Sequence, residues 1–201
     1  MRMSMFDQGE FDFMPEPQRR PKKPERLFLG IFPDAPAAQE AQLVHKRLSS
    51  ETGLTGRMLE LERFHTSLLH VSDRRWLRSK DIYAAELAAN RVRISPFELS
   101  FSQMGSFRGM PKKGRPLLHP LVLLADEGPV IELYEMLGAE FRKFRYPVPE
   151  HFRPHLTLSY DEQLIPMRST GPITFVVKEF VLVHSKLWLT EYEVLRTWTL
   201  H

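Results

Sequence analysis

"RPHLTLSY", residues 153–160, places a histidine at the start of an apolar, strand-forming run. Successive side chains of a β-strand point to opposite faces, so residues two apart share a face. The imidazole of His155 and the hydroxyl of Thr157 are therefore expected to point at one ligand together. Single histidines of this kind are common in strands, so the pattern gains meaning only if the chain holds a second copy.

The stretch "FHTSLL", residues 64–69, is that second copy, with His65 and Ser67 in the matching places. The copies lie one in each half of the chain, each after a predicted helix, which indicates a duplicated lobe that contributes one histidine per copy. A third histidine, His70, also has a serine two residues later, but a turn begins there. An odd number of residues separates His70 from His65, so a regular strand would place them on opposite faces, and we leave His70 out of the expected site.

The segments around these motifs predict an α+β fold. Paired strands between helices favour largely antiparallel sheets over a doubly wound parallel sheet. Asp34 can cap the first helix, with Pro36 in its first turn. The last two strands are expected to form a hairpin. Strands are expected at residues 26–33, within 53–61, and at 64–71, 94–107, 117–125, 153–160, 172–187 and 192–200, and helices at 34–48, 79–90 and 128–145.

The composition is that of an ordinary globular protein, with 42% apolar and 26% charged residues in a chain of 201 residues. We expect one two-lobed domain over residues 26–201. Residues 1–25 have no strand or helix pattern and end in "RRPKKPER", residues 19–26, where proline disfavours regular structure. We therefore expect a flexible N-terminal tail, and the net charge of +3 is weakly in favour of an acidic ligand such as a phosphodiester.

Several classes of protein are excluded by what the sequence lacks. The chain contains no cysteine, which excludes disulfides, thiolate metal sites and a cysteine nucleophile. No apolar run reaches the ~18 residues of a membrane span, and the N-terminus has no signal-peptide pattern. We expect a monomer in the cytoplasm with no membrane partner, since small secreted domains more often carry disulfides.

Taken with the flanking strands, the two motifs resemble the two-histidine phosphoesterase superfamily, in the branch named for bacterial RNA 2′,5′-ligases and RNA 2′,3′-cyclic phosphodiesterases. The resemblance rests on "RLFLGIFP" (residues 26–33), on "FHTSLL" and "RPHLTLSY" as the two His-x-[Thr/Ser]-x motifs, and on the closing hairpin "EFVLVHSKL…YEVLRTWTL". It implies a bilobal fold in which two mostly antiparallel sheets face each other across a cleft, with the helices outside. It also implies RNA ends or nucleotides carrying a cyclic phosphate or a 2′,5′ linkage as partners.

The chemistry of a cyclic phosphate agrees with these residues. Hydrolysis needs a base that deprotonates water and an acid that protonates the leaving ribose oxygen, on opposite sides of phosphorus. Histidine, with an ordinary pKa near 6.5, suits both roles at neutral pH, and neither a metal nor another cofactor is required. The hydroxyls of Ser67 and Thr157 can donate hydrogen bonds to the phosphate oxygens as negative charge grows. By resemblance His65 is the acid and His155 the base, an order that the residues alone leave open.

One position departs from the resemblance. Related cyclic phosphodiesterases commonly have an arginine five residues after the second histidine, where this chain has Tyr160. Tyrosine can donate one hydrogen bond or stack on a base, but it cannot neutralise a phosphate. Arg153, or Arg115 and Lys113 in the basic turn "RGMPKKGRP", can supply the missing charge, and the sequence does not choose among them.

Three alternatives stay open at this stage. The same chemistry can act on a small cyclic nucleotide, an ADP-ribose cyclic phosphate or a 2′,5′-linked oligonucleotide. The chain can instead be a non-catalytic module that binds RNA or nucleotides in the same cleft. His119 can join the two motif histidines in a metal site, although no nearby carboxylate is indicated. Three aromatic residues, Phe28, Phe32 and Trp188, are expected in the core.

Overall fold

The structure, a computed structural model, describes residues 25–187, 189 and 191–201. It contains three α-helices, one short 3-10 helix and eight strands within these residues. The expected tail, residues 1–25, lies outside the described residues except for Glu25, which begins the first strand. The elements are β1 (Glu25–Ile31), α1 (Ala35–Thr52), η1 (Leu61–Arg63), β2 (Thr66–Arg74), α2 (Ser79–Ala89), β3 (Phe97–Ser106), β4 (His119–Ala125), α3 (Pro129–Lys143), β5 (His155–Asp161), β6 (Arg168–Val177), β7 (Glu179–Lys186) and β8 (Glu191–Thr199).

The eight strands form one sheet in the order β6-β3-β4-β5-β2-β1-β7-β8, and all seven pairings are antiparallel. The α+β prediction with mostly antiparallel pairing is therefore confirmed. The two sheets that were expected are instead the two halves of one continuous sheet, β6-β3-β4-β5 and β2-β1-β7-β8. They are joined at its centre, where β2 pairs with β5 through a single residue pair, Thr66 and Leu156.

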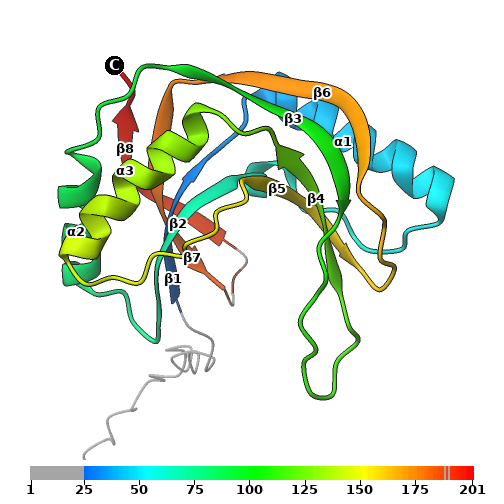
Figure 1. The fold of residues 1–201 in the computed structure, drawn as a ribbon. Helices are drawn as coiled ribbons and strands as arrows, with labels where there is room; N and C mark the ends of the chain where they lie inside the picture. Colours follow the sequence, from blue (N-terminus) through cyan, green and yellow to red (C-terminus); the bar gives the residue numbers. More distant parts are fainter. Residues whose placement is uncertain (1–24, 188, 190) are drawn as a thin grey trace, which may run out of the picture.

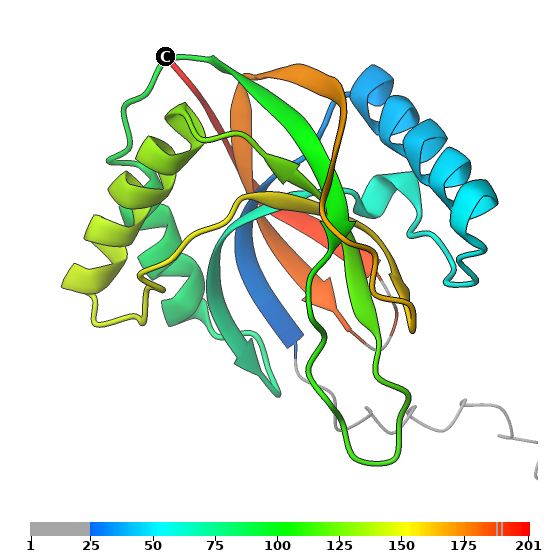
Figure 2. The same ribbon diagram turned by 45° about the vertical axis from the view of Figure 1, so that its right-hand side comes forward.

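The sheet curves into an open arch, with α2 and α3 together on one side of the molecule and α1 on the other (Figures 1 and 2). The main core lies between these helices and the sheet, and its fully buried side chains include Leu29, Phe64, Leu99 and Phe141. A smaller apolar cluster of Phe28, Val181 and Val183 lies apart from that core. Because none of the three described α-helices covers the inner side of the arch, polar side chains at the centre of the sheet can reach solvent there.

Local sequence explains the ends of α1. The carboxylate of Asp34 accepts a hydrogen bond from the amide of Ala37 at 2.9 Å, and Pro36 lies in the first turn, as predicted. The helix continues to Thr52, four residues beyond the predicted end. It stops at Gly53, whose φ of 72° is a left-handed conformation that glycine adopts at little cost.

Two predicted strands are wrong. Residues 53–61 form no strand: Met58 makes an isolated bridge to Ser159, and the amides of Thr55 and Gly56 bind the carboxylate of Asp161 instead of a neighbouring strand. The run 172–187 is not one strand, because it divides at Lys178 into β6, which pairs with β3, and β7, which pairs with β1. An apolar pattern does not reveal such a division, since it does not say which neighbour each part pairs with. The predicted closing hairpin is confirmed as β7 and β8.

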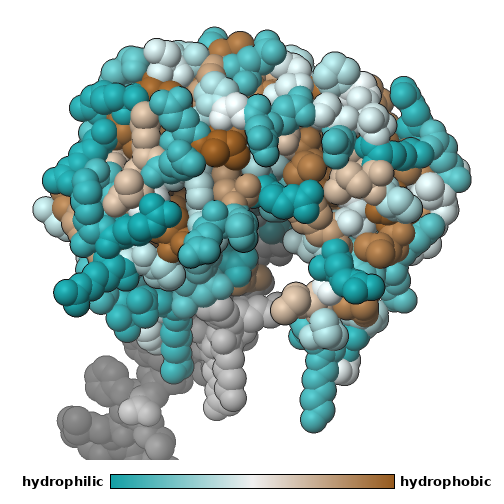
Figure 3. All heavy atoms as spheres, in the orientation of Figure 1, coloured by the Kyte–Doolittle hydropathy of each residue, from teal (hydrophilic) through white to brown (hydrophobic). Residues whose placement is uncertain are grey.

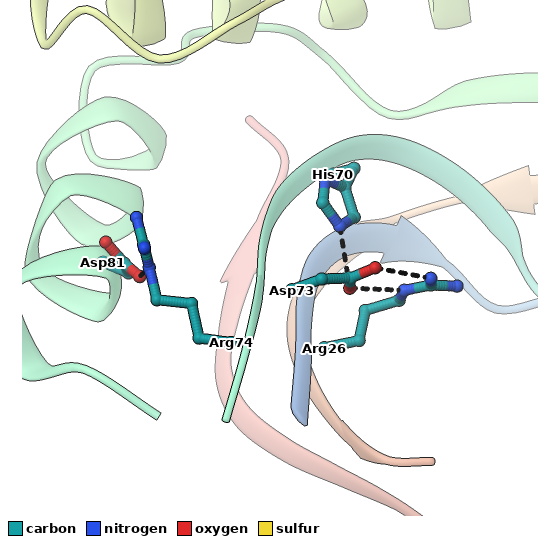
Figure 4. Close-up of polar contacts among 5 residues, drawn as sticks. All are labelled: Arg26, His70, Asp73, Arg74 and Asp81. Carbon is teal, nitrogen blue, oxygen red and sulfur yellow. Dashed lines mark hydrogen bonds and ion pairs between the residues drawn. The ribbon is translucent and has the colours of Figure 1, made fainter. Parts of the chain in front are cut away.

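A buried ionic cluster fixes α2 against β2. Asp81 is fully buried and accepts hydrogen bonds from Arg74 Nε at 2.9 Å and from the hydroxyl of Tyr146 at 2.6 Å; Figure 4 shows the contact with Arg74. Burial, together with this bond to a carboxylate, raises the pKa of Tyr146 to about 12. The cluster holds the far end of β2, whose first residues lie at the centre of the sheet beside the motif histidines.

Candidate active site

The two motif histidines have matching hydrogen bonds. His65 Nδ1 lies 2.8 Å from the carbonyl oxygen of Arg63, and His155 Nδ1 lies 2.7 Å from the carbonyl oxygen of Arg153. A carbonyl oxygen can only accept, so each Nδ1 must carry the proton. Each neutral imidazole therefore keeps its lone pair on Nε2, which is the nitrogen left for proton transfer.

The two Nε2 atoms differ in their present partners. The hydroxyl of Ser67 donates to His65 Nε2 at 3.0 Å, as the shared strand face predicts. Thr157 is half-buried on the face that His155 occupies, and among the described residues no hydrogen bond joins its hydroxyl to that imidazole. Ser67 is thus engaged with its histidine, whereas the Thr157 hydroxyl is available to another acceptor.

Each histidine also belongs to a group of an arginine, an aromatic ring and the imidazole. Arg63 lies over the ring of Tyr192 at 5.0 Å, and that ring meets His65 edge-on at 5.4 Å. In the other half, Arg153 lies over Phe107 at 5.0 Å, and Phe107 meets His155 edge-on at 5.0 Å. A guanidinium is therefore held close to each imidazole by a cation–π contact.

Sequence reasoning included Arg153 among the candidates but missed Arg63. The signal was present, because an arginine stands two residues before both motif histidines, in "RFH" and in "RPH". The structure brings Arg153 to the site and leaves Lys113 and Arg115, the other two candidates, on the long β3–β4 connection. Arg115 lines a cavity there together with Tyr160, and Lys113 is exposed beyond that cavity.

Aromatic side chains surround His65. Phe28 lies 4.8 Å and Phe32 6.0 Å from the imidazole, measured between ring centres, and Tyr192 packs against both rings. The expectation that Phe28 is a core residue is confirmed, although it belongs to the small apolar cluster beside His65 and not to the main core. Phe32 is only partly buried and packs against that cluster. Both residues face this side because β1 presents Leu27, Leu29 and Ile31 to the main core. Trp188 lies outside the described residues.

The surroundings lower the pKa of both histidines. Burial is the largest cause for His65, and the positive charges of His155, Arg63 and Arg26 add to it, so that the pKa falls to about 4. Burial likewise lowers the pKa of His155, with a contribution from the charge of Arg153. An anion bound between the two imidazoles would stabilise their charged forms and so oppose this lowering of their pKa values.

The expected placement of His70 on the face opposite His65 is wrong. Leu68 and Leu69 are both buried, and the β1–β2 register passes from Leu69 to Ser67 without pairing Leu68, so an irregularity interrupts the alternation of β2. His70 therefore emerges on the exposed side with Ser67, and both line a cavity with His155. Its Nε2 binds Asp73, which also accepts two hydrogen bonds from Arg26 (Figure 4).

The second motif contains the same irregularity. Leu158 and Ser159 are both fully buried, and the β4–β5 register shifts at this point. Simple alternation would place Tyr160 on the face of β5 opposite His155. Because two consecutive buried residues precede it, Tyr160 instead lies on the same face as His155, and 47% of its surface is exposed. Burial raises the pKa of Tyr160, and the charges of Arg26 and Arg63 act on it from the opposite half of the sheet.

His119 does not join the motif histidines. It is buried at the base of the β3–β4 connection, where its Nδ1 accepts a hydrogen bond from the amide of Gly109 at 2.9 Å. Within the part of the chain that the structure describes, no three His, Cys, Asp or Glu side chains are grouped as metal ligands.

The described helices include none that is long and apolar enough to cross a membrane.

Comparison with known proteins identifies relatives of this fold. The model of the 2′-5′ RNA ligase superfamily matches residues 69–187, a range that includes the second motif and begins just after the first. Among solved structures, TT0787 of Thermus thermophilus is 21% identical, with a TM-score of 0.69 over 87% of this chain and 97% of that chain. LigT of E. coli is 25% identical, with a TM-score of 0.66 over 89% of this chain and 98% of its own. LigT complexed with 3′-AMP gives the same identity and TM-score over 88% and 98%. No curated protein sequence is significantly similar to the chain.

Proposed function

Because this chain belongs to the 2′-5′ RNA ligase superfamily, we propose that it is a phosphodiesterase that opens the 2′,3′-cyclic phosphate ends of RNA to 2′-phosphates. His65 and His155 are its acid and base, and the reaction needs no metal ion. In a parallel reaction, the 5′-hydroxyl of a second RNA end would attack phosphorus in place of water and join the two ends through a 2′,5′ linkage, with the same P–O3′ bond broken.

The proposed step moves two protons. The neutral imidazole of His155 takes a proton from water at Nε2, and the water oxygen attacks phosphorus opposite the ribose 3′-oxygen. The bond from phosphorus to O3′ breaks, and protonated His65 gives its Nε2 proton to that oxygen. The products are a 2′-phosphate and a free 3′-hydroxyl, and the two imidazoles have exchanged protonation states.

The observation that carries the proposal is the matched tautomer of the two imidazoles. Each Nδ1 is committed to a backbone carbonyl, so each Nε2 is the acid or base atom in its half of the site. Two such nitrogens, one from each half of the sheet, suit in-line displacement better than a general binding role, which needs no particular tautomer.

The charge that Tyr160 does not supply can come from the two arginine–aromatic groups. Arg63 and Arg153 stand in equivalent positions beside the two histidines. Guanidinium groups bind phosphate oxygens in a fixed, two-pronged geometry, and their charge would stabilise the negative charge that grows on those oxygens. We therefore assign Arg63 and Arg153, with the hydroxyls of Ser67 and Thr157, to the nonbridging phosphate oxygens.

The ligand of a relative supports the substrate class. LigT of E. coli, 25% identical to this chain, is described in complex with 3′-AMP. 3′-AMP carries its phosphate on a ribose oxygen at the position where a 2′,3′-cyclic phosphate is attached. A ribonucleotide end is therefore one substrate class to test, and the LigT complexes with ATP and with NADP+ keep other nucleotides in the same panel.

The test is a panel of cyclic phosphates assayed with wild-type protein, His65→Ala and His155→Ala, in the presence of EDTA. We expect turnover by the wild type and a loss of at least ~100-fold in each variant, because each removes one of the two proton-transfer groups. His201→Ala, at the exposed end of the chain, is the matched control and should retain full activity. Undiminished turnover by His155→Ala would refute the two-histidine mechanism. Binding of the cyclic phosphates without turnover by the wild type would favour a non-catalytic binding module.

A further inference from the structure

The connection between β3 and β4, residues 107–118, is a long projecting hairpin loop. It stands away from the arch of the sheet in Figures 1 and 2, and in Figure 3 a hollow lies beside it. The loop carries four cations and no acidic residue: Arg108, Lys112, Lys113 and Arg115. None of the four forms an ion pair with another described residue. The loop is therefore a concentrated, uncompensated positive charge.

A cavity of about 460 Å³ lies under this loop. Cations and apolar groups both line it, and Tyr160 contributes an aromatic surface from β5. Its walls include Arg108, Met110, Lys112, Arg115, Leu118 and Tyr160. A cavity of this volume is within the range that holds one small ligand, and its mixture of cations with apolar and aromatic surface suits a nucleotide.

The loop is attached directly to the active site. Phe107, its first residue, is the ring that meets His155 edge-on, and its amide binds the carbonyl oxygen of Pro120 at 3.0 Å. The neighbouring amide of Gly109 binds His119, as described above. A Cβ atom at Gly109 would lie 1.8 Å from the carbonyl oxygen of Leu118, so the two strands of the neck approach each other too closely for any side chain. The base of the loop is thus fixed relative to His155.

Tyr160 connects the cavity to the histidines. It lines the cavity under the loop and lies on β5, the strand that begins with His155. The irregularity at Leu158–Ser159 leaves His155, Thr157 and Tyr160 on the same, less buried face of that strand. A ligand held between the two imidazoles can therefore extend past Tyr160 to the loop without leaving the surface of the protein.

We propose that the hairpin loop and Tyr160 form a subsite for the nucleotides that precede the cyclic phosphate end, so that the preferred substrate is a single-stranded oligoribonucleotide and not a mononucleotide. This inference rests on the proposed function. A 2′,3′-cyclic phosphate is terminal, so the rest of an RNA continues only through the 5′-oxygen of that nucleotide. A base stacks on Tyr160, and the preceding phosphates bind Arg108, Lys112 and Arg115.

The test compares two substrates in one assay: a mononucleoside 2′,3′-cyclic phosphate and an RNA of about six nucleotides with the same end. The loop variant is Arg108→Gln/Lys112→Gln/Arg115→Gln. We expect it to lose at least ~10-fold in kcat/KM on the oligonucleotide and less than ~2-fold on the mononucleotide. On the oligonucleotide, the slope of log(kcat/KM) against log salt concentration should become shallower by about 2, since each neutralised phosphate of a single strand contributes about 0.7.

The matched control removes three cations elsewhere. Arg47→Gln/Lys80→Gln/Lys178→Gln lies on the helices and at the β6–β7 break, has the same net charge as the loop variant, and should behave as the wild type on both substrates. An equal loss on the two substrates in the loop variant, or no loss on either, would overturn the subsite.

A binding measurement separates this proposal from the proposed function. Anisotropy of a fluorescent RNA of about six nucleotides ending in a 2′-phosphate reports the subsite even if no substrate is turned over. Weaker binding by the loop variant than by its control would support the subsite in that case. Equal binding by the two variants would refute it, whatever the activity of the wild type.

Discussion

Removal of the Tyr192 ring should return His65 toward its ordinary acidity. The pKa of His65 is lowered to about 4, with burial as the largest cause, and Tyr192 is one of three rings that exclude water from it. At pH 6 an imidazole with a pKa of about 4 is ~1% protonated, whereas one with the ordinary value of 6.5 is ~76% protonated. The accessible range for Tyr192→Ala is therefore large enough to measure.

A second effect of this substitution acts in the opposite direction. Tyr192 holds the guanidinium of Arg63 at 5.0 Å from its ring, and without the ring that cation can move closer to His65 and lower its pKa. Burial outweighs the charge of Arg63 as a cause of the shift, so the net change should be upward. The double variant Tyr192→Ala/Arg63→Gln removes both the Tyr192 ring that shields His65 from water and the positive charge of Arg63. It should raise the pKa of His65 more than Tyr192→Ala alone does.

The assay is a pH titration of the imidazole carbon and proton resonances by NMR, with the His65 signal assigned by its absence in His65→Ala. Tyr83→Ala, which removes an exposed tyrosine from α2, is the matched control and should leave the titration unchanged. A wild-type His65 that titrates near pH 6.5, or a Tyr192→Ala protein that titrates where the wild type does, would refute the reasoning from burial.

Two further predictions concern catalysis and stability. The active free enzyme needs one charged and one neutral imidazole, and the pKa values of both histidines are lowered. The value of kcat/KM should therefore be greatest below pH 6.5 and fall about tenfold per pH unit above that optimum. A maximum of kcat/KM at pH 8 would contradict this. Asp81→Ala leaves Arg74 and Tyr146 without their buried acceptor and should lower the free energy of unfolding in urea by about 3 kcal/mol. The exposed Glu127→Ala should change that free energy by less than about 0.5 kcal/mol, and a similar value for Asp81→Ala would show that the cluster is not stabilising.

The duplicated motif was predictable because the chemistry uses local spacing. A histidine and a hydroxyl two residues apart share a strand face in any sheet, so His65 with Ser67 and His155 with Thr157 could be paired from the sequence alone. The caps of α1 are local in the same way, since Asp34 acts on an amide three residues away.

The positions five residues after each histidine could not be placed from spacing. Two consecutive buried residues follow each hydroxyl, Leu68–Leu69 in one half and Leu158–Ser159 in the other, and they shift the alternation by one residue. Such irregularities depend on the register with neighbouring strands, which a single strand's sequence does not contain. The alternation rule therefore misplaced His70, and it would misplace Tyr160 in the same way.

The partners of the arginines were equally hidden. Arg63 and Arg153 stand at visible, equivalent positions in the sequence, but the rings that hold them come from elsewhere in the chain. Tyr192 lies on β8 and Phe107 at the start of the hairpin loop, and only the folded sheet brings each ring to its histidine. The division of residues 172–187 between β6 and β7 has the same cause, because strand pairing decides it and the apolar pattern does not.

The single residue pair between β2 and β5 fixes the two halves of the active site to each other. Thr66 directly follows His65, and Leu156 directly follows His155, so the pair that joins the two halves of the sheet is adjacent to both imidazoles. The backbone pairing that joins the two halves of the sheet therefore lies one residue from each imidazole-bearing position. Insertions in distant loops, longer helices or a remodelled hairpin loop can change which substrate the protein binds without altering this pairing. Substrate choice can therefore change in evolution while the arrangement of the two histidines stays the same.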